Sequence, residues 1–513
     1  MAMKTTTIET GKVRGLVAGN QNVTVFRGIP YAGPTSGKDR FMPPKPASAW
    51  EGVRDCTEFG EICIQGVMFH GMPFSDFFLK EFYPYSWPQG ENSLVLNIWT
   101  PAETPDEKLP VMFWIHGGGM SAGYGHEMEF DGEAIAKRGV ILVTINYRVD
   151  VLAWFAHPEL SKRSEYGMSG NLGLWDQQYA LKWVRRNIAA FGGDPDNVTI
   201  FGQSAGAGSV ISQTVMPGSR GLFHRAIIQS GAGGIGSVGR PPMGGGSLAP
   251  EEWGVKACEL LGKTVDELQA MDAQDCFKAL KDCEEKIGPC PRSVSHPVLF
   301  PNAAETYAKG LEADVPIIAG SVNGDGAMFA RSYESKDAER EAILRQHLGE
   351  YYDEFLAKYP LSGEGAEIAD ALTAAGTIDG SVCVGYARQR SGHAPSYSYY
   401  FDGFIPGEDE FNFIGRGDAY HSIEMWYIFG VLGRCWRRFD GRHYDLSQDM
   451  TDYWTNFAKN GDPNGDGLAP WPKFEGTGSG TMVLSERRRE TTCVTTEAMT
   501  KLYDFLYGKL ANK

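Results

Sequence analysis

Short apolar runs alternate with longer amphipathic segments through much of the chain. The runs at 109–115 and 140–147 are almost continuously apolar, which is typical of strands covered on both faces. The segment 173–187 instead spaces its apolar residues as a helix does. Further strands are expected at 23–32, 94–99, 198–201, 224–229 and 315–319, and a small-residue helix at 205–215. This alternation predicts an α/β fold with a large, mostly parallel central sheet flanked by helices.

Three other stretches interrupt this pattern. Residues 231–250 are rich in glycine, which favours a flexible insertion. Residues 251–290 and 334–390 are charged and have helical spacing, so we expect them to form a helical cap or side region. Because neither a repeat nor a clean linker is evident, we expect one catalytic domain over 1–513, with insertions at about 231–300 and 334–390.

Composition narrows the classes of partner. The chain has 48 Lys+Arg against 64 Asp+Glu, a net charge of −16, which argues against nucleic acid and anionic membranes as partners. No apolar run approaches the ~20 residues of a membrane span, and residues 1–11 lack the apolar core of a signal peptide. Nine cysteines without a CxxC pair favour reduced thiols in the cytoplasm and give no metal site. No cofactor is indicated, and the oligomeric state is not readable.

A candidate nucleophile lies at Ser204. Residues 202–206 read Gly-Gln-Ser-Ala-Gly, a GxSxG motif between an expected strand and an expected helix. A serine on such a tight strand-to-helix turn presents its hydroxyl outward. The following helix start, at Ala205, offers free N–H groups to a developing oxyanion.

The motif alone is weakly specific. Residues 119–123 read Gly-Met-Ser-Ala-Gly, a second match that no strand immediately precedes. We therefore interpret Ser121 as a loop residue without a nucleophilic role.

A glycine run is the expected companion of the serine turn. His116-Gly-Gly-Gly follows the apolar strand at 109–115, and no GKS or GKT follows it, which excludes a phosphate loop of that type. Backbone N–H groups in such a run approach a substrate carbonyl closely. The candidate oxyanion donors are the N–H groups of Gly118, Gly119 and Ala205.

These motifs together resemble the type-B carboxylesterases, the carboxylesterase/cholinesterase branch of the α/β-hydrolase fold. The resemblance runs from Val25 to the region of Phe505. Besides the two motifs above, it rests on segments 26–32 (FRGIPYA), 91–97 (ENSLVLN), 170–177 (GNLGLWDQ), 191–199 (FGGDPDNVT) and 457–464 (FAKNGDPN).

The resemblance implies the other two members of a catalytic triad. The family carries its acid in a segment like 320–329 (GSVNGDGAMF), which gives Asp325 that role, although many members have Glu there. The family histidine matches His421, within 418–430. The order Ser204, Asp325, His421 is the one that the fold requires.

Other residues compete for these roles. His443 satisfies the chain order as a base, but it lies in an Arg-rich stretch that we interpret as a solvated loop. Asp418 is a rival acid, although three residues before His421 is an awkward place from which to reach that ring. Ser230 either hydrogen-bonds near the triad or simply ends a strand. His116 is expected to support the oxyanion loop.

The chain departs from its family at three positions. Gln203 precedes the nucleophile where Glu is common, which removes a negative charge beside the site. Secreted members often form disulfides that here would require cysteines at Ser93 and near Lys263. The missing partners strengthen the expectation of a reduced, cytoplasmic protein.

The resemblance implies a serine carboxylesterase acting on a small-molecule ester without a cofactor. Short-chain acyl or aryl esters, feruloyl or cinnamoyl esters, and lactones or carbamates all remain open as substrates. Aromatic residues between 69 and 87 either fill the core or line the entrance, with Phe74, Phe78 and Trp87 as candidate pocket residues. The competing hypothesis is a non-catalytic, neuroligin-like binding protein on the same fold.

Overall fold

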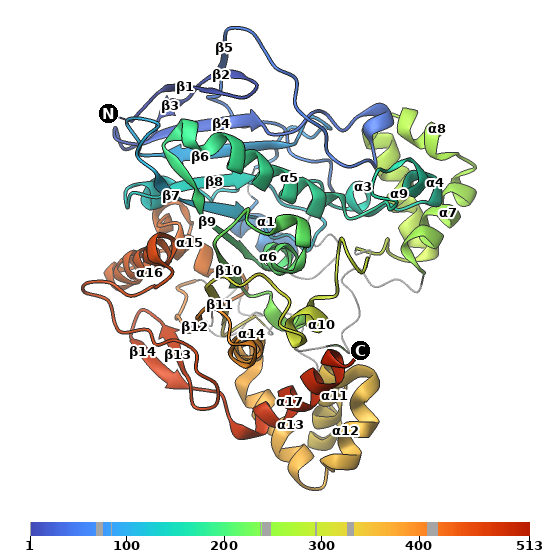
Figure 1. Ribbon diagram of the computed structural model, residues 1–513, viewed down its shortest axis with the longest axis vertical. Helices are drawn as coiled ribbons and strands as arrows, with labels where there is room; N and C mark the ends of the chain where they lie inside the picture. The colour runs from blue at the N-terminus through green and yellow to red at the C-terminus, as the bar shows by residue number, and fades with distance from the viewer. Residues whose placement is uncertain are drawn as a thin grey trace. The chain divides into compact units, whose positions relative to one another are not determined.

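The chain forms two compact units, whose helices and strands are labelled in Figure 1. The computed structural model describes residues 2–67, 75–83, 85–235, 238, 248–292, 295–325, 333–407 and 419–513. The first unit comprises Met1–Thr199, Gly221–Phe223 and Pro241–His296, and the second comprises Ile200–Arg220, His224–Arg240 and Pro297–Lys513. One strand, β9 (Gly193–Gln203), runs from the first unit into the second.

The first unit is built on a mixed sheet. Its strands lie in the order β7-β8-β6-β4-β3. They are β3 (Leu16–Val17), β4 (Thr24–Pro30), β6 (Val95–Thr100), β7 (Leu109–Ile115) and β8 (Ile141–Ile145). β7 and β8 are parallel, whereas β6 is antiparallel to both β4 and β8. All of β6 and β8, and β7 from Val111 onward, are buried, as their continuous apolar runs predict.

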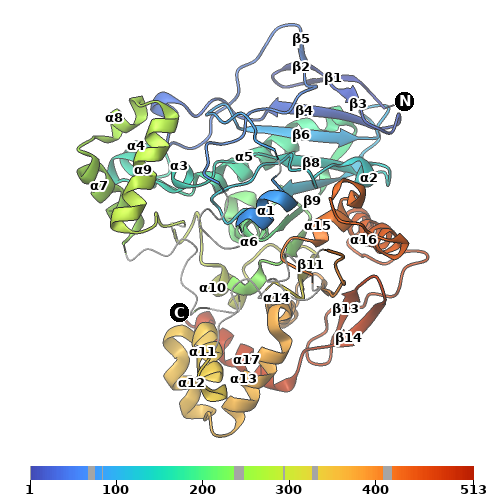
Figure 2. The same ribbon diagram turned by 180° about the vertical axis from the view of Figure 1, so that it is seen from behind.

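A smaller sheet and a group of helices complete the first unit. The sheet has the order β1-β2-β5, with β1 (Thr5–Ile8), β2 (Gly11–Arg14) and β5 (Val53–Asp55). The helices are α1 (Ser75–Glu81), α2 (Glu133–Ala136), α3 (Val151–Trp154), α4 (Pro158–Arg163), α5 (Leu172–Asn187), α7 (Pro250–Leu261), α8 (Val265–Ala270) and α9 (Ala273–Ile287). Helices α4, α7, α8 and α9 gather together in both ribbon views (Figures 1 and 2). The helical prediction for 251–290 is therefore confirmed.

Parallel strands dominate the second unit. The end of β9 continues into the order β9-β10-β11-β12-β13-β14. The added strands are β10 (Arg225–Gln229), β11 (Ile317–Val322), β12 (Ser396–Phe401), β13 (Gly480–Leu484) and β14 (Arg489–Cys493). β10 to β13 run parallel and β14 is antiparallel. The carboxyl ends of parallel strands share one edge of a sheet, where α/β proteins place their functional residues.

The second unit also contains a set of helices. They are α6 (Ala205–Val215), α10 (Ala303–Ala308), α11 (Lys336–Leu348), α12 (Tyr352–Lys358), α13 (Glu364–Ala375), α14 (Asp379–Ser391), α15 (Glu424–Ile428), α16 (Gly441–Asn460) and α17 (Glu497–Ala511). α6 contacts β10, and α14 contacts both β11 and β12. α11, α12, α13 and α17 cluster near the C-terminus in Figures 1 and 2. The helical prediction for 334–390 is confirmed.

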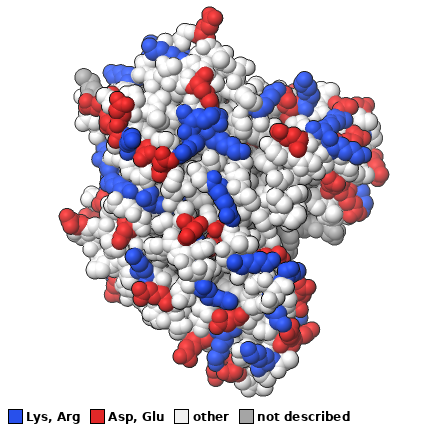
Figure 3. All heavy atoms as spheres, viewed as in Figure 1, with Lys and Arg blue, Asp and Glu red and all other residues white. Residues whose placement is uncertain are grey.

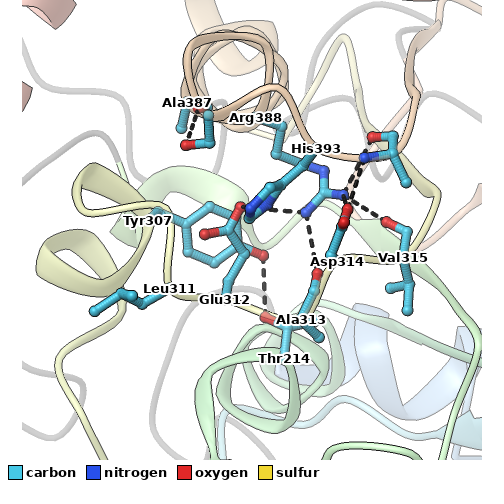
Figure 4. Close-up of polar contacts among 12 residues, drawn as sticks. Thr214, Tyr307, Leu311, Glu312, Ala313, Asp314, Val315, Ala387, Arg388 and His393 are labelled. Atoms are coloured by element: carbon cyan, nitrogen blue, oxygen red, sulfur yellow. Dashed lines mark hydrogen bonds and ion pairs between the residues drawn. The ribbon is translucent and has the colours of Figure 1, made fainter.

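A buried ionic network fixes the entry into β11 (Figure 4). The Arg388 guanidinium lies 3.2 Å from a carboxylate oxygen of Glu312, and the same oxygen lies 2.9 Å from Nδ1 of His393. Arg388 also donates to the carbonyl of Val315 at 2.6 Å. The side chains of Arg388 and Glu312 are 1% and 0% exposed, and burial raises the pKa of Glu312. The network ties the end of α14 to the loop that leads into β11.

Two sequence predictions need adjustment. The strand expected at 198–201 is the end of the longer β9, and β12 to β14 escaped prediction. Most of the glycine-rich insertion falls outside the described residues.

None of the helices in the described part of the chain combines the length and apolar character that crossing a membrane requires. Figure 3 shows Lys and Arg interspersed with Asp and Glu, so the face it displays has no single continuous acidic area.

Candidate active site

Ser204 lies on a strained turn between β9 and α6. β9 ends at Gln203 and α6 begins at Ala205, so the predicted strand-turn-helix context is present. The backbone of Ser204 has φ 58° and ψ −124°, a combination that non-glycine residues rarely adopt and that costs about 1–3 kcal/mol. The Ser204 N–H donates to the carbonyl of Gln229 in β10 at 2.8 Å. This backbone bond ties the turn to the neighbouring strand.

A glycine behind the turn allows this close packing. A Cβ on Gly231 would lie 2.7 Å from the carbonyl oxygen of Ser204 and 2.5 Å from Cβ of Ala207. Ser204 occupies the N-cap position of α6, but its side chain makes no capping hydrogen bond. Its hydroxyl is therefore not engaged in capping, and the first N–H groups of α6, starting at Ala205, have no partner within the helix.

Asp325 and His421 meet directly in the second unit. Nδ1 of His421 lies 2.5 Å from Oδ1 of Asp325, and Oδ2 of Asp325 accepts the N–H of Val322 at 3.2 Å. The Asp325 side chain is 10% exposed and that of His421 is 18% exposed. A carboxylate held at both oxygens in this way fixes the orientation of the imidazole and its tautomer, with the proton on Nδ1.

Backbone pairing brings the two loops together. The N–H of Gly324 donates to the carbonyl of Ala419 at 2.8 Å, and the N–H of Ala419 donates to Oδ1 of Asn323 at 2.8 Å. A Cβ on Gly324 would lie 2.5 Å from that same Ala419 oxygen, so only glycine permits the approach. The loop after β11 and the segment before His421 are therefore joined one residue before Asp325 and two residues before His421.

Gln203 contacts the ring of His421. Its amide nitrogen lies 3.2 Å from Nε2 and 3.5 Å from Nδ1 of the imidazole. Its amide oxygen accepts the hydroxyl of Ser422 at 2.9 Å. Ser204 follows directly in the chain. Among the described residues, the His421 ring is thus in polar contact with Asp325 and Gln203, and it makes no direct hydrogen bond to the Ser204 hydroxyl.

Glu424 is a neighbour of this site that the sequence analysis did not single out. It lies in α15, its side chain is fully buried, and neither carboxyl oxygen has a hydrogen-bond partner among the described residues. Burial raises its pKa well above the ordinary value, and the charge of Asp325 raises it further. This favours the neutral acid. The feature of the sequence that could have pointed to Glu424 is its position three residues after His421.

The glycine run has the local backbone expected for an oxyanion loop. Gly118 and Gly119 lie in the first unit, with φ of 100° and 62°. Within the described structure, no residue accepts a hydrogen bond from either N–H. The carbonyl of Gly119 is held by Arg292 at 2.7 Å, and the carbonyl of Gly118 accepts the N–H of Ser121 at 3.0 Å. Both donors remain available, while their carbonyls are fixed.

His116 supports this loop from below. Its ring is fully buried and stacks on Tyr147, with centroids 4.2 Å apart, and the Tyr147 hydroxyl donates to the His116 carbonyl at 2.7 Å. Burial lowers the pKa of His116 to about 3. A ring that resists protonation in this way is suited to packing and not to proton transfer, as expected.

The competing residues are placed elsewhere. Ser121 lies in a turn, and its hydroxyl donates to Gly119 at 3.3 Å. Ser230 has a buried hydroxyl with no partner among the residues described, so no bond ties it to the triad. The prediction that His443 lies in a solvated loop is wrong: it is buried in α16, where apolar packing covers it and Nδ1 bonds the Tyr427 hydroxyl at 2.8 Å. Asp418 lies outside the described residues.

The candidate pocket residues lie in aromatic clusters of the first unit. Phe78 is buried in α1 and contacts Phe77 and Phe82, with centroids 5.4 and 5.7 Å apart. Trp87 packs edge-on against His126 at 4.7 Å and Phe59 at 5.9 Å. Phe74 lies outside the described residues. In the described part of the chain, no group of three or more His, Cys, Asp or Glu residues is arranged to hold a metal ion.

Comparisons with known proteins identify the family of the chain. A sequence model of the carboxylesterase family matches residues 2–382 and 381–504. The chain is 34% identical over 501 residues to the para-nitrobenzyl esterase of Bacillus subtilis (strain 168), covering 94% of this chain and 95% of that protein. It is 32% identical over 498 residues to the fumonisin B1 esterase of Sphingopyxis macrogoltabida, covering 92% of this chain and 84% of that protein.

A solved structure of a PNB esterase is similar over 98% of this chain and 99% of its own, with 29% identity and a TM-score of 0.77. The family match covers almost the whole chain and includes both the serine turn and the Asp325–His421 pair. The chain therefore belongs to the carboxylesterase family and is a carboxylic ester hydrolase with the α/β-hydrolase fold.

Proposed function

We propose that this ester hydrolase uses Ser204 as nucleophile, His421 as general base and Asp325 as the residue that orients His421. The observation that carries the proposal is the 2.5 Å contact between Nδ1 of His421 and Oδ1 of Asp325, in the same unit as the serine turn. Asp325 fixes the proton on Nδ1, which leaves the Nε2 lone pair to accept a proton. The family match and the motif order support the assignment.

The reaction begins when Oγ of Ser204 attacks the ester carbonyl carbon. The hydroxyl proton passes to Nε2 of His421, and the carbonyl oxygen becomes negative. We assign stabilisation of this oxyanion to the N–H groups of Gly118, Gly119 and Ala205. Two observations support this assignment. Among the described residues, none accepts a hydrogen bond from the N–H of Gly118 or Gly119, and the first N–H groups of α6 have no partner within the helix.

The tetrahedral intermediate then collapses. The bond between the carbonyl carbon and the alkoxy oxygen breaks, and the leaving alcohol takes the proton from Nε2 of His421. Water next gives a proton to His421 and attacks the acyl-enzyme, and collapse returns the proton to Ser204. Asp325 stabilises the imidazolium that forms in each half of the cycle. The residues named here supply every proton transfer.

We propose short-chain acyl or aryl esters as the substrates. The relatives named above, a para-nitrobenzyl esterase and a fumonisin B1 esterase, support ester substrates as a class and leave feruloyl, cinnamoyl, lactone and carbamate substrates as alternatives. Phe78 and Trp87 are proposed pocket residues because large aromatic surfaces suit apolar acyl and aryl groups. The neuroligin-like alternative is not favoured by the esterase relatives.

The test uses the second GxSxG motif as an internal control. We expect p-nitrophenyl acetate to give a burst of nitrophenol in the wild type, and a fluorophosphonate probe to label Ser204. Ser204→Ala is expected to lose labelling and at least ~10³-fold in kcat, whereas Ser121→Ala retains both. Full activity in Ser204→Ala would overturn the assignment. A series of acyl lengths and aryl esters then ranks the substrate classes.

We also propose a cytoplasmic location, which rests on the cysteines. Ser93 and Lys263 stand where secreted relatives commonly have bridging cysteines, and a reducing compartment keeps thiols free. Labelling of the unreduced, denatured protein with a maleimide tests this. All nine cysteines are expected to react, and protection of a pair would contradict the proposal.

A further inference from the structure

The Gln203 amide lies over the face of the His421 ring. Its nitrogen is 3.2 Å from Nε2 and 3.5 Å from Nδ1. The two imidazole nitrogens flank Cε1, so a donor in the ring plane at these distances from both would clash with that carbon. The contact is therefore of the weak N–H···π kind. Asp325 takes the in-plane position at Nδ1, and the in-plane lone pair of Nε2 is left for another donor.

The amide itself is anchored on its other side. Its oxygen accepts the Ser422 hydroxyl at 2.9 Å, and Gln203 is only 3% exposed. Ser422 has φ 78°, an uncommon conformation for a residue with a side chain. The hydrogen bond from Ser422, the residue that follows His421 in the chain, therefore anchors the Gln203 amide beside the ring.

The orientation of the amide has an electrostatic consequence. Its N–H end carries the positive end of the amide dipole and faces the ring, which disfavours a cationic imidazolium and favours the neutral form. The titratable group in contact with the ring is Asp325, and the charge of Asp325 in turn reaches Glu424 of α15 and Tyr399 of β12, whose pKa values it raises. Of the two polar contacts of the ring, Asp325 carries a titratable carboxyl group, whereas the amide of Gln203 is neutral at every pH.

We infer that Gln203 is a positioning residue for the catalytic base: its amide holds the plane of the His421 ring and biases the ring toward the neutral, proton-accepting form. This inference rests on the proposed role of His421. When the ring is protonated during catalysis, the N–H end of the amide repels the imidazolium and the Asp325 carboxylate attracts it. The neutral amide thereby extends ester hydrolysis to lower pH than a carboxylate at the same position would allow.

The test compares pH profiles of kcat/KM for p-nitrophenyl acetate. Gln203→Glu keeps the size and shape of the side chain but places a negative charge beside the ring, which stabilises the imidazolium. The acid limb of the profile is expected to move up by about one pH unit. Gln203→Ala removes the amide that contacts the ring, and kcat is expected to fall about tenfold with little change in KM. Ser422→Ala removes the hydrogen bond that anchors the amide, and kcat is expected to fall by a smaller factor.

Gln389→Glu is the matched control, because Gln389 is exposed on α14 and its variant adds the same charge away from the ring. Its profile is expected to overlay that of the wild type. A folded Gln203→Glu enzyme, checked by circular dichroism and thermal melting, whose acid limb coincides with the wild type would overturn the inference. So would a Gln203→Ala enzyme with unchanged kcat.

A second readout separates this inference from the proposed function. NMR of the histidine ring signals follows the titration of His421 without substrate. If hydrolysis does not depend on Ser204, the proposed function fails, yet the ring signals still report whether Gln203→Glu moves the titration upward. An upward move supports the positioning role by itself. Unmoved ring signals overturn it, whatever the activity.

Discussion

Nδ1 of His421 lies 2.5 Å from Oδ1 of Asp325, although 96 residues separate them along the chain. The approach depends on the loop after β11 and on a backbone bond between Gly324 and Ala419. Asp325 also accepts the N–H of Val322, so the carboxylate is held from its own loop as well as by the ring. The pair is thus built by the second unit alone, from two loops that pair through their backbones.

Replacing this carboxylate is expected to damage catalysis far more than folding. Asp325→Asn keeps the size of the side chain, but its amide can donate to Nδ1 and favour the wrong tautomer of His421. We expect kcat to fall by on the order of 10³–10⁴-fold, measured with p-nitrophenyl acetate. Asp325→Glu keeps the charge and should retain much more activity. Equal losses in both variants would show that geometry, and not charge, decides the effect.

Gly231 is expected to be essential to the shape of the serine turn. A methyl group there would meet the Ser204 carbonyl and Ala207 at 2.7 and 2.5 Å. Gly231→Ala should therefore lower the free energy of unfolding by about 1–3 kcal/mol and reduce kcat, because the turn must shift. Gly508→Ala is the control: nothing lies within 4 Å of the added methyl in α17, and stability should rise by roughly 0.5–1 kcal/mol. Urea unfolding and initial rates measure both.

Motifs and periodicity located the serine turn well, because their signals are local. The helix predicted at 205–215 and the strand at 109–115 have those same bounds in the structure. Asp325 and His421 were assigned only through a family resemblance, since nothing in their local sequences specifies a contact across 96 residues. Such a contact depends on strand order and loop pairing.

Burial was harder to predict than secondary structure. His443 was expected in a solvated loop because arginines surround it in sequence, yet it faces the interior from α16. On a helix, charged neighbours point outward while the residue between them faces the core. Glu424 was missed for the complementary reason: a carboxylate with no partner is rarely expected in a core, and its burial depends on the packing of α15.

The network at the entry to β11 should contribute strongly to stability. Arg388→Met removes the permanently charged partner of the buried Glu312, leaves only His393 beside that carboxylate, and frees carbonyls that include Val315. The expected loss is about 3–5 kcal/mol in the free energy of unfolding, because a buried charge loses its compensation. Arg390→Met, on the same helix but 36% exposed and 3.7 Å from Asp504, should cost less than about 1 kcal/mol.

A double variant identifies the cause of the Arg388 effect. Adding Glu312→Gln to Arg388→Met removes the uncompensated charge and should restore part of the lost stability. If the double variant is as unstable as Arg388→Met, the loss arises from the freed carbonyls and not from the carboxylate. Denaturation in urea at neutral pH measures the wild type, Arg388→Met and the double variant, and the comparison separates the two contributions.

Glu127 and Glu129 should make the stability of the first unit depend on pH. They are 5% and 2% exposed, the Tyr124 N–H donates to Glu127 at 2.9 Å, and one oxygen of Glu129 has no partner among the described residues. Burial raises the pKa of Glu127 from 4.5 to about 8 and raises that of Glu129 well above its ordinary value. Folding therefore favours the protonated carboxyl groups.

The sign of the pH effect follows from these shifts. Both pKa values are higher in the folded than in the unfolded chain, so the stability that the two groups contribute is complete below about pH 4.5. The share of Glu127 is lost as the pH rises through about 8, and that of Glu129 is lost as the pH rises through its own raised pKa. Glu129→Gln stays neutral and should therefore gain in stability on the wild type as the pH rises from about 5.5 to about 8.5. Glu51→Gln, at an exposed position, should give no such change. Urea midpoints at the two pH values decide it, and a constant difference between wild type and Glu129→Gln would refute the shifted carboxyl pair.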